Sequence, residues 1–168
     1  IEQSIKARGD GEEDSVANAE SAELMGAEIE FEKVVATIGA REFFVKANAS
    51  YIDSEVVRDP VNFNRVTNLT GPLQGQSDWL GNLQVGFENL DVGEKFNIIL
   101  NYQGDRIYRL GTSNRPDLIE DIPVQVNFLY SRDFDLFGNE NPITMTFKAQ
   151  NLLNEKALRM QGTQIAES

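Results

Sequence analysis

The sequence contains neither cysteine nor histidine. Without cysteine the chain forms no disulfide bond and has no thiol nucleophile, and without either residue it cannot build a zinc site of the Cys/His kind. Catalytic triads that use an imidazole base are excluded as well. Carboxylates are abundant, yet no pair is singled out by an apolar setting. We therefore assign no catalytic residue, no metal site and no cofactor, and we expect no enzymatic activity.

Positive charge is scarce. The chain has 15 lysine and arginine residues against 27 aspartate and glutamate residues, which gives a formal net charge of -12 and a pI near 4.4. Proteins that bind nucleic acid or adsorb to anionic membrane surfaces need basic patches to neutralise phosphate. We therefore expect no nucleic-acid partner.

Long hydrophobic runs are also missing. No stretch of about 18 apolar residues is present, so no transmembrane helix is predicted. Transmembrane β-strands are not excluded, because about 9 to 11 residues of alternating polarity are enough to cross a bilayer. The chain starts at Ile1 without a basic and apolar leader and ends at Ser168 without an obvious terminator. We interpret it as part of a longer protein.

The composition that remains is that of an ordinary folded protein. Hydrophobic residues make up 40% and charged residues 25% of the chain, so disorder over its whole length is not expected. A chain of 168 residues is long enough for one sizeable domain and short for two. Residues 1–168 are therefore treated as a single structural unit.

The clearest local pattern lies in residues 72–88, where a polar, turn-forming segment leads into residues that alternate between apolar and polar. Side chains of a strand alternate between its two faces, so this pattern predicts a loop followed by a β-strand with one apolar face. The apolar positions are Trp79, Leu83, Val85 and Phe87, and the polar positions are Asn82, Gln84 and Glu88.

The same period of two recurs along the chain and no helical period competes with it. The fold class predicted is all-β, an antiparallel up-and-down meander of about six strands. In the strand expected at 95–108, Ile99 is the exception, an apolar residue on the polar side. The strands are expected at residues 23–33, 42–54, within 72–88, and at 95–108, 122–132 and 143–153.

The connections alternate in length. They are short between the first and second, third and fourth, and fifth and sixth strands, and long elsewhere, which is typical of a meander with two unlike ends. Long loops are expected at 6–20, 55–76 and 109–121, with an irregular tail at 154–168. The acidic residues at 10, 12, 13 and 14 match no EF-hand spacing and are interpreted as a solvated loop.

The alternation of apolar and polar residues does not decide which face of the sheet meets water. In a soluble β-barrel or β-sandwich the apolar face points inward, and in an outer-membrane barrel it points outward to lipid. Strand lengths near 9 to 11 residues, aromatic residues towards strand ends and alternating loop lengths favour the membrane. A soluble binding module with an apolar interior remains the alternative.

Several short motifs also resemble a known family. In chain order they are Gly26–Glu30, Ala49–Ile52, Pro72–Ser77, Leu83 with Gly86, Leu100–Tyr102, Gly104–Ile107 and Asn151–Glu155. From Pro72 onward they resemble the C-terminal part of the barrel of TonB-dependent outer-membrane receptors, and the first two are similar to strands just before that part. The matching segments follow one another in the same order over nearly the whole chain.

The resemblance implies a barrel of about 22 strands closed by an N-terminal plug domain. Such a receptor takes up a scarce ligand, for example an iron-siderophore, a vitamin or a saccharide, across the bacterial outer membrane with energy delivered through TonB. The implied partners are TonB, the lipid bilayer and a small-molecule ligand. This chain departs from the family in lacking the plug, and it stops before the family's final strand, which ends in an aromatic residue.

In the family's topology the long loops face the outside of the cell, which implies that ligand contacts come from them. Guanidinium groups suit anionic ligands, and amides and carboxylates add polar contacts. Salt bridges within a solvated loop are the plain alternative for each residue. The candidate ligand-binding residues are Arg106, Arg109, Asn114, Arg115 and Asp117.

Overall fold

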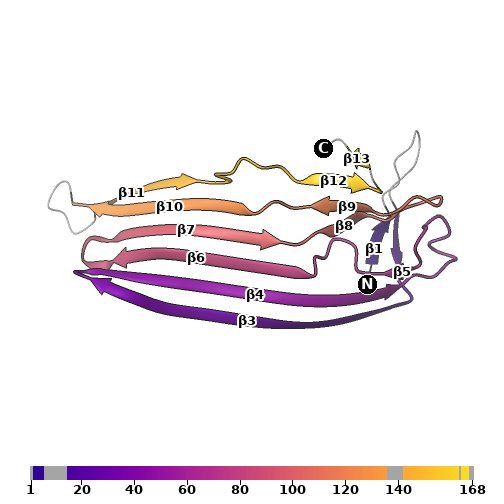
Figure 1. Cartoon of the computed structure of the whole chain (residues 1–168), viewed down its shortest axis with the longest axis horizontal. Coiled ribbons are helices and arrows are strands. Elements are labelled where there is room, and N and C mark those ends of the chain that lie inside the picture. The colour runs from indigo at the N-terminus through magenta and orange to yellow at the C-terminus, as the bar shows by residue number, and fades with distance from the viewer. Residues whose placement is uncertain (1, 6–14, 136–141, 163, 167–168) are drawn as a thin grey trace.

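The computed structural model describes residues 2–5, 15–135, 142–162 and 164–166, and these form strands with one short 3₁₀ helix (Figure 1). The predicted all-β, antiparallel fold class is confirmed. The elements are β1 (Glu2–Ile5), β2 (Ser15–Asn18), β3 (Ser21–Ile38), β4 (Arg41–Val57), β5 (Thr70–Gly71), β6 (Trp79–Asn89), η1 (Leu90–Val92), β7 (Glu94–Gln103), β8 (Arg106–Arg109), β9 (Leu118–Asp121), β10 (Gln125–Phe134), β11 (Ile143–Ala149), β12 (Leu158–Gln161) and β13 (Gln164–Ala166).

Six long strands make the main sheet, in the order β11-β10-β7-β6-β4-β3, with the short β5 paired to β4. Each long strand pairs antiparallel with the long strand before it in the chain. This is the predicted meander. Among the described strands, β3 and β11 form the two edges of this sheet.

The short links gather at one end of the main sheet, on the left in Figure 1. The turn between β3 and β4 has Gly39 at φ 64°, and the turn between β6 and β7 contains η1 followed by Gly93 at φ 58°. Glycine adopts such left-handed conformations without steric cost. The long connections lie at the opposite end, together with β1, β2, β5, β8, β9, β12 and β13 (Figure 1).

Short strands interrupt the segments that we predicted as loops. β2 lies in the predicted loop 6–20, of which residues 6–14 fall outside the described chain, and β9 lies in 109–121. The loop 55–76 contains the end of β4 and all of β5. The predicted irregular tail contains β12 and β13, which join β9 and β8 in a separate four-stranded sheet. Strands of two to four residues are too short for their alternation to be detected from sequence.

The predicted strand 95–108 is two strands, because β7 ends at Gln103 and β8 starts at Arg106. Between them the Gly104 amide donates to the Trp79 carbonyl over 2.8 Å, which ends the ladder of the main sheet.

β10 starts only at Gln125, since Pro123 has no amide hydrogen for a ladder. β11 ends at Ala149 rather than at residue 153, and Asn151 follows with φ 49°.

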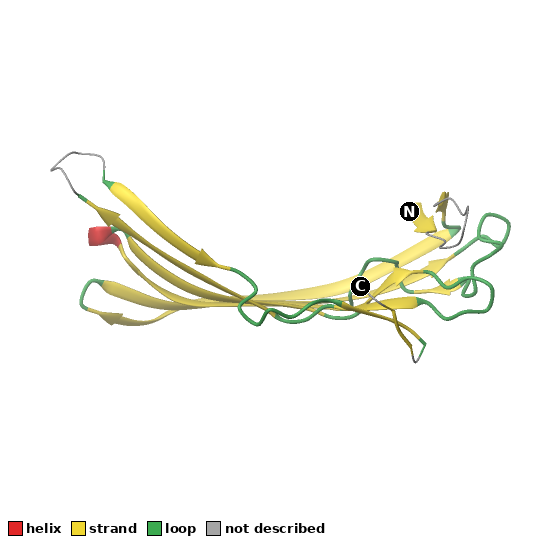
Figure 2. Ribbon diagram, turned by 90° about the horizontal axis from the view of Figure 1, so that it is seen from above, coloured by secondary structure: helices red, strands yellow, loops and turns green. Residues whose placement is uncertain are grey.

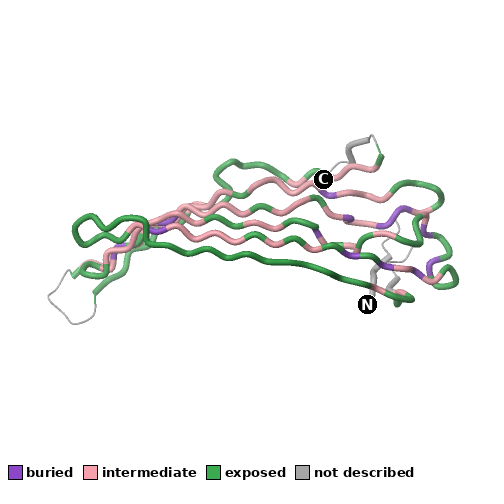
Figure 3. The backbone as a smooth tube through the Cα atoms, turned by 60° about the horizontal axis from the view of Figure 1, so that its bottom comes forward, coloured by how far each residue is buried: buried purple, intermediate pink, exposed green. Residues whose placement is uncertain are grey.

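The main sheet is a single twisted layer (Figure 2). Large apolar side chains on it are exposed, with Met25 at 78% and Ile29 at 70%. Most buried residues lie at the long-connection end, and a few, such as Phe44 and Asn97, lie towards the short links (Figure 3). At the long-connection end, Phe63, Val66, Ile107 and Leu110 form a small apolar core.

Close packing across the main sheet requires glycine at position 86. A β-carbon there would clash with the Phe96 carbonyl oxygen and would lie 3.1 Å from the Phe44 ring. Phe44 is among the few buried apolar residues of the main sheet. The aromatic ring therefore covers the backbone that the glycine leaves open.

We predict that Gly86→Ala destabilises the chain by about 1–3 kcal/mol, because the new methyl group forces Phe44 and the neighbouring backbone apart. Urea unfolding followed by circular dichroism measures the effect. Gly81→Ala is the matched control, since the nearest atom to a β-carbon there is 3.8 Å away. Equal losses in the two variants would contradict the packing argument.

Candidate functional site

The two faces of the main sheet differ in chemistry because the strands pair in a register that keeps like residues together. One row is apolar across five adjacent strands, and a row on the opposite face is amide across four. On the remaining strand, β3, the two rows continue with Lys33 and Glu30. Aligned apolar residues make a continuous hydrophobic surface, as cross-strand neighbours lie about 5 Å apart. The apolar row is Val45, Val85, Ile98, Phe128 and Ala149, and the amide row is Asn48, Asn82, Asn101 and Gln125.

Aromatic side chains bound the apolar face at both ends. Tyr51 packs on Trp79 towards the long connections, with ring centroids 4.8 Å apart. Phe43 packs on Phe87 towards the short links, at 5.4 Å. Eight residue steps separate these two levels on each strand, which is about 26 Å at about 3.3 Å per residue. The ring contacts continue across the sheet through Phe87–Phe96, Phe96–Phe128 and Phe128–Phe147.

The opposite face presents hydrogen-bonding side chains. The Asn82 amide donates to Asn48 Oδ1 over 2.8 Å, and the Gln84 amide donates to Asn97 Oδ1 over 2.7 Å. Ile99 lies on this face, as its position in the pattern indicated, beside a shallow hollow of about 220 Å³ that Asn48, Asn82 and Gln84 also line. This surface offers amide donors and acceptors to water or to a polar solute, and the charged side chains of Glu30 and Lys46 also line the hollow.

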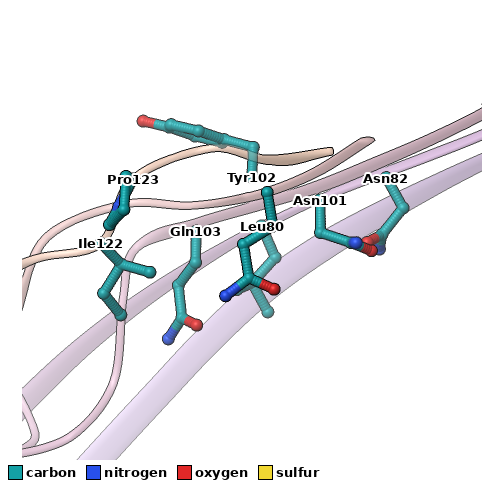
Figure 4. A pocket seen from close by; sticks show the side chains of 8 residues that line it. Leu80, Asn82, Asn101, Tyr102, Gln103, Ile122 and Pro123 are labelled. Atoms are coloured by element: carbon teal, nitrogen blue, oxygen red, sulfur yellow. The ribbon is translucent and has the colours of Figure 1, made fainter. Parts of the chain in front are cut away.

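A second hollow of about 200 Å³ lies further along the amide face. In Figure 4, Asn82, Asn101 and Gln103 point to one side of the sheet, and Tyr102 points to the other. Gln103 is held in place by donating to Ser77 Oγ over 3.1 Å. The two hollows share Asn82, so they adjoin on the amide face.

A buried carboxylate organises the small sheet at the long-connection end. Glu120 accepts hydrogen bonds from Arg106 at 2.6 and 2.9 Å and from Arg159 at 3.0 Å, and its side chain is 5% exposed. The Arg159 guanidinium also lies 3.8 Å from the centre of the Tyr108 ring. Burial by itself would raise the pKa of the Glu120 carboxyl, but the two arginines outweigh it and hold that pKa below its usual value.

All five candidate ligand-binding residues lie on the β8–β9 hairpin. Arg106 is engaged by Glu120, and Arg109 lies over the Tyr108 ring at 6.0 Å with a buried Nε that makes no hydrogen bond. Asp117 accepts from the Gly111 amide at 2.6 Å and from the Asn68 side chain at 3.1 Å. Asn114, with φ 64°, and Arg115 form the turn between the strands. The hairpin brings these residues together in the fold, while Arg106, Arg109 and Asp117 make their contacts with other residues.

Sequence reasoning missed three residues that organise this end. Glu120 and Arg159 were placed in a loop and an irregular tail, although they pair through β9 and β12. Arg58 is 1% exposed and donates to the Asn68 and Pro72 carbonyls at 3.2 and 2.9 Å, so it holds the long connection in shape. A single arginine within a predicted loop, here 55–76, carries no sequence signal of burial, since arginine is usually exposed.

Within the described ranges, no group of three histidine, cysteine, aspartate or glutamate side chains could hold a metal ion. The acidic residues at 10, 12, 13 and 14 lie outside those ranges. The described part of the chain also has no helix that is long and apolar enough to cross a membrane. Comparison with protein-family models, curated proteins and solved structures finds no match to the chain.

We predict that Glu120→Gln lowers stability at neutral pH by about 1.5–3 kcal/mol, because two guanidinium groups lose their charged acceptor. Folding lowers the pKa of Glu120, so the carboxylate's stabilising contribution is fully present above its unfolded pKa of about 4.3. That contribution is lost as the pH falls through the lower, folded value.

Unfolding curves of the parent chain and Glu120→Gln between pH 7 and pH 3 check this prediction. The difference in stability between the two should shrink towards the acid end. Glu155→Gln, which removes an exposed carboxylate, is the control and should change stability little. A pH-independent difference between Glu120→Gln and the parent would refute the electrostatic explanation.

Proposed function

We propose that this chain forms part of the wall of an outer-membrane β-barrel transporter, of the type of the TonB-dependent receptors, which imports a scarce small-molecule ligand. The observation that carries the proposal is the apolar face, about 26 Å between its aromatic levels. A transmembrane barrel carries an outward apolar band about 25 Å tall, with aromatic girdles at both interfaces. The resemblance of the sequence motifs to that family supports the same conclusion.

The amide face would then line the interior of the barrel. A water-filled or plugged lumen requires polar side chains, and rows of asparagine and glutamine satisfy this need without fixed charge. The hollows beside Asn82 supply surface for a polar solute or for the family's plug domain, through which TonB delivers energy. In this arrangement neither face of the single-layer sheet needs a second layer from the same chain.

The sheet edges fit the same proposal. Backbone groups in lipid must all be hydrogen-bonded, so a membrane sheet has to close on itself. Strands β3 and β11 have free edges among the described strands, and the proposal assigns further strands of the barrel to both. The long connections would face the cell exterior and the short links the periplasm. The β8–β9 hairpin, with Arg106, Arg109, Asn114, Arg115 and Asp117, would meet the incoming ligand.

The orientation of the two faces is tested with single-cysteine variants, which are unique labels because the chain has no cysteine. Leu83→Cys and Asn82→Cys are neighbours on opposite faces. With an environment-sensitive dye in lipid vesicles, we expect brominated acyl chains to quench the dye on residue 83. Aqueous iodide should quench the dye on residue 82.

The reverse pattern would overturn the proposal. A soluble β-sandwich or β-barrel with an apolar interior gives a third result, in which the dye on residue 83 is protected from both quenchers. Thr144→Cys, on the polar face of the edge strand β11, is a further control and should follow residue 82. The experiment therefore separates the membrane proposal from its soluble alternative.

We also predict that the 168-residue chain self-associates in buffer without detergent, because its apolar face and two sheet edges are open. Light scattering should give a mass well above the 18.8 kDa of one chain, and detergent micelles should reduce it. A monodisperse monomer in plain buffer would contradict this expectation.

A further inference from the structure

A row of polar side chains crosses the apolar face just beyond its aromatic level at the short-link end. On its strand, each residue of this row lies two positions closer to the short links than an aromatic residue of the neighbouring row. The registers therefore place the two rows side by side. The polar row is Arg41, Asn89, Glu94 and Arg132, and the aromatic row is Phe43, Phe87, Phe96 and Tyr130.

Arg41 and Glu94 satisfy each other within this row. Glu94 accepts from Arg41 Nη2 at 2.8 Å and Nε at 2.9 Å, and its other oxygen accepts from the Tyr130 hydroxyl at 2.9 Å. The Arg41 guanidinium also lies 5.0 Å from the centre of the Phe87 ring. Both carboxylate oxygens are thus occupied, and the Glu94 side chain is only 6% exposed.

Arg132 leaves this row with one unbalanced positive charge. The row contains two arginines and one carboxylate. Glu94 attracts both Arg41 and Arg132 electrostatically, but its two oxygens are taken by hydrogen bonds from Arg41 and Tyr130. The row as a whole therefore keeps one excess positive charge. The Arg132 guanidinium lies 5.6 Å from the Phe134 ring, and its buried Nε makes no hydrogen bond. A buried N–H without an acceptor costs free energy, so this group favours a ligand that supplies an oxygen anion.

We propose that Arg132 binds the phosphodiester of an anionic phospholipid whose acyl chains cover the adjacent aromatic row. The inference rests on the proposed function, because it needs the apolar face to meet lipid. A guanidinium fork matches phosphate oxygens geometrically, and long basic side chains reach from apolar surface to the headgroup level. The occupant is therefore a membrane lipid rather than a free anion, since only a lipid covers both rows at once.

The opposite end of the same face lacks this chemistry. Beyond the Tyr51–Trp79 level the register pairs Met25 with Asp53 and Glu23 with Glu55, so the face becomes acidic there. A net charge of -12 over the whole chain also argues against general adsorption to anionic lipid. Selectivity for a phosphate-bearing headgroup is thus a local property of the short-link rim.

The test uses the 168-residue chain with Met145→Cys, because Met145 is exposed and lies directly opposite Arg132 in the register. A dye on residue 145 reports quenching by brominated phosphatidylglycerol or by brominated phosphatidylcholine, each diluted in the same mixed vesicles. Trp79, the one tryptophan in the sequence, reports insertion by its quenching with brominated phosphatidylcholine.

We expect phosphatidylglycerol to be preferred roughly fivefold at residue 145, which corresponds to about 1 kcal/mol for one arginine near anionic lipid. Arg132→Gln should bring the ratio close to one without changing the quenching of Trp79. Lys95→Gln is the matched control, because it removes one positive charge at the same end but on the amide face. It should leave the fivefold preference unchanged.

If the two lipids quench the dye equally in the Met145→Cys chain that keeps Arg132, the proposal is overturned. This result does not depend on whether Arg132→Gln inserts into vesicles. A preference that survives Arg132→Gln also overturns it. In both cases quenching of Trp79 leaves the proposed function standing. Absence of Trp79 quenching in every variant rejects the proposed function and the lipid site together.

Discussion

The register between neighbouring strands is the constraint on which the rest of the structure depends. Side chains alternate with period two, so a shift of one residue in any pair would move a whole strand's apolar side chains to the other face. Here the row through Val45, Val85 and Ile98 and the row through Asn48, Asn82 and Asn101 stay unbroken over neighbouring strands. Both faces, and with them the aromatic levels and the polar rim, follow from that alignment.

The two ends of the molecule are stabilised in different ways. The main sheet relies on backbone ladders and cross-strand pairs, since little of its side-chain surface is buried. The long-connection end has a small apolar core around Phe63 and Leu110 and two nearly inaccessible charged groups, Arg58 and Glu120. Buried ion pairs add little net stability but hold one geometry, because breaking them leaves a charge uncompensated. Such groups suit connections that must keep a defined shape.

The sequence was sufficient for the six long strands, their order and their faces, because alternation over about ten residues is a strong signal. The sequence pattern also placed Ile99 on the amide face, where it lines the hollow together with Gln84. The break at Gly104, the delayed start at Gln125 and the pairing of Glu120 with Arg159 were missed. Each depends on a partner distant in sequence: the Trp79 carbonyl for Gly104, and β12 for Glu120. The candidate residues of the β8–β9 hairpin could be located from the sequence, whereas their hydrogen-bond partners could not.

The consecutive strand order also governs how the sheet can form in time. Every long strand pairs with the one that precedes it, so each addition closes only a modest loop and needs no rearrangement of earlier pairs. Loop-closure entropy then rises slowly as the sheet grows, and folding speed benefits from the low sequence separation of its contacts. The two-residue turn at Gly39 makes β3 and β4 the pair of long strands that closes the shortest loop in the described chain, at the lowest entropic cost.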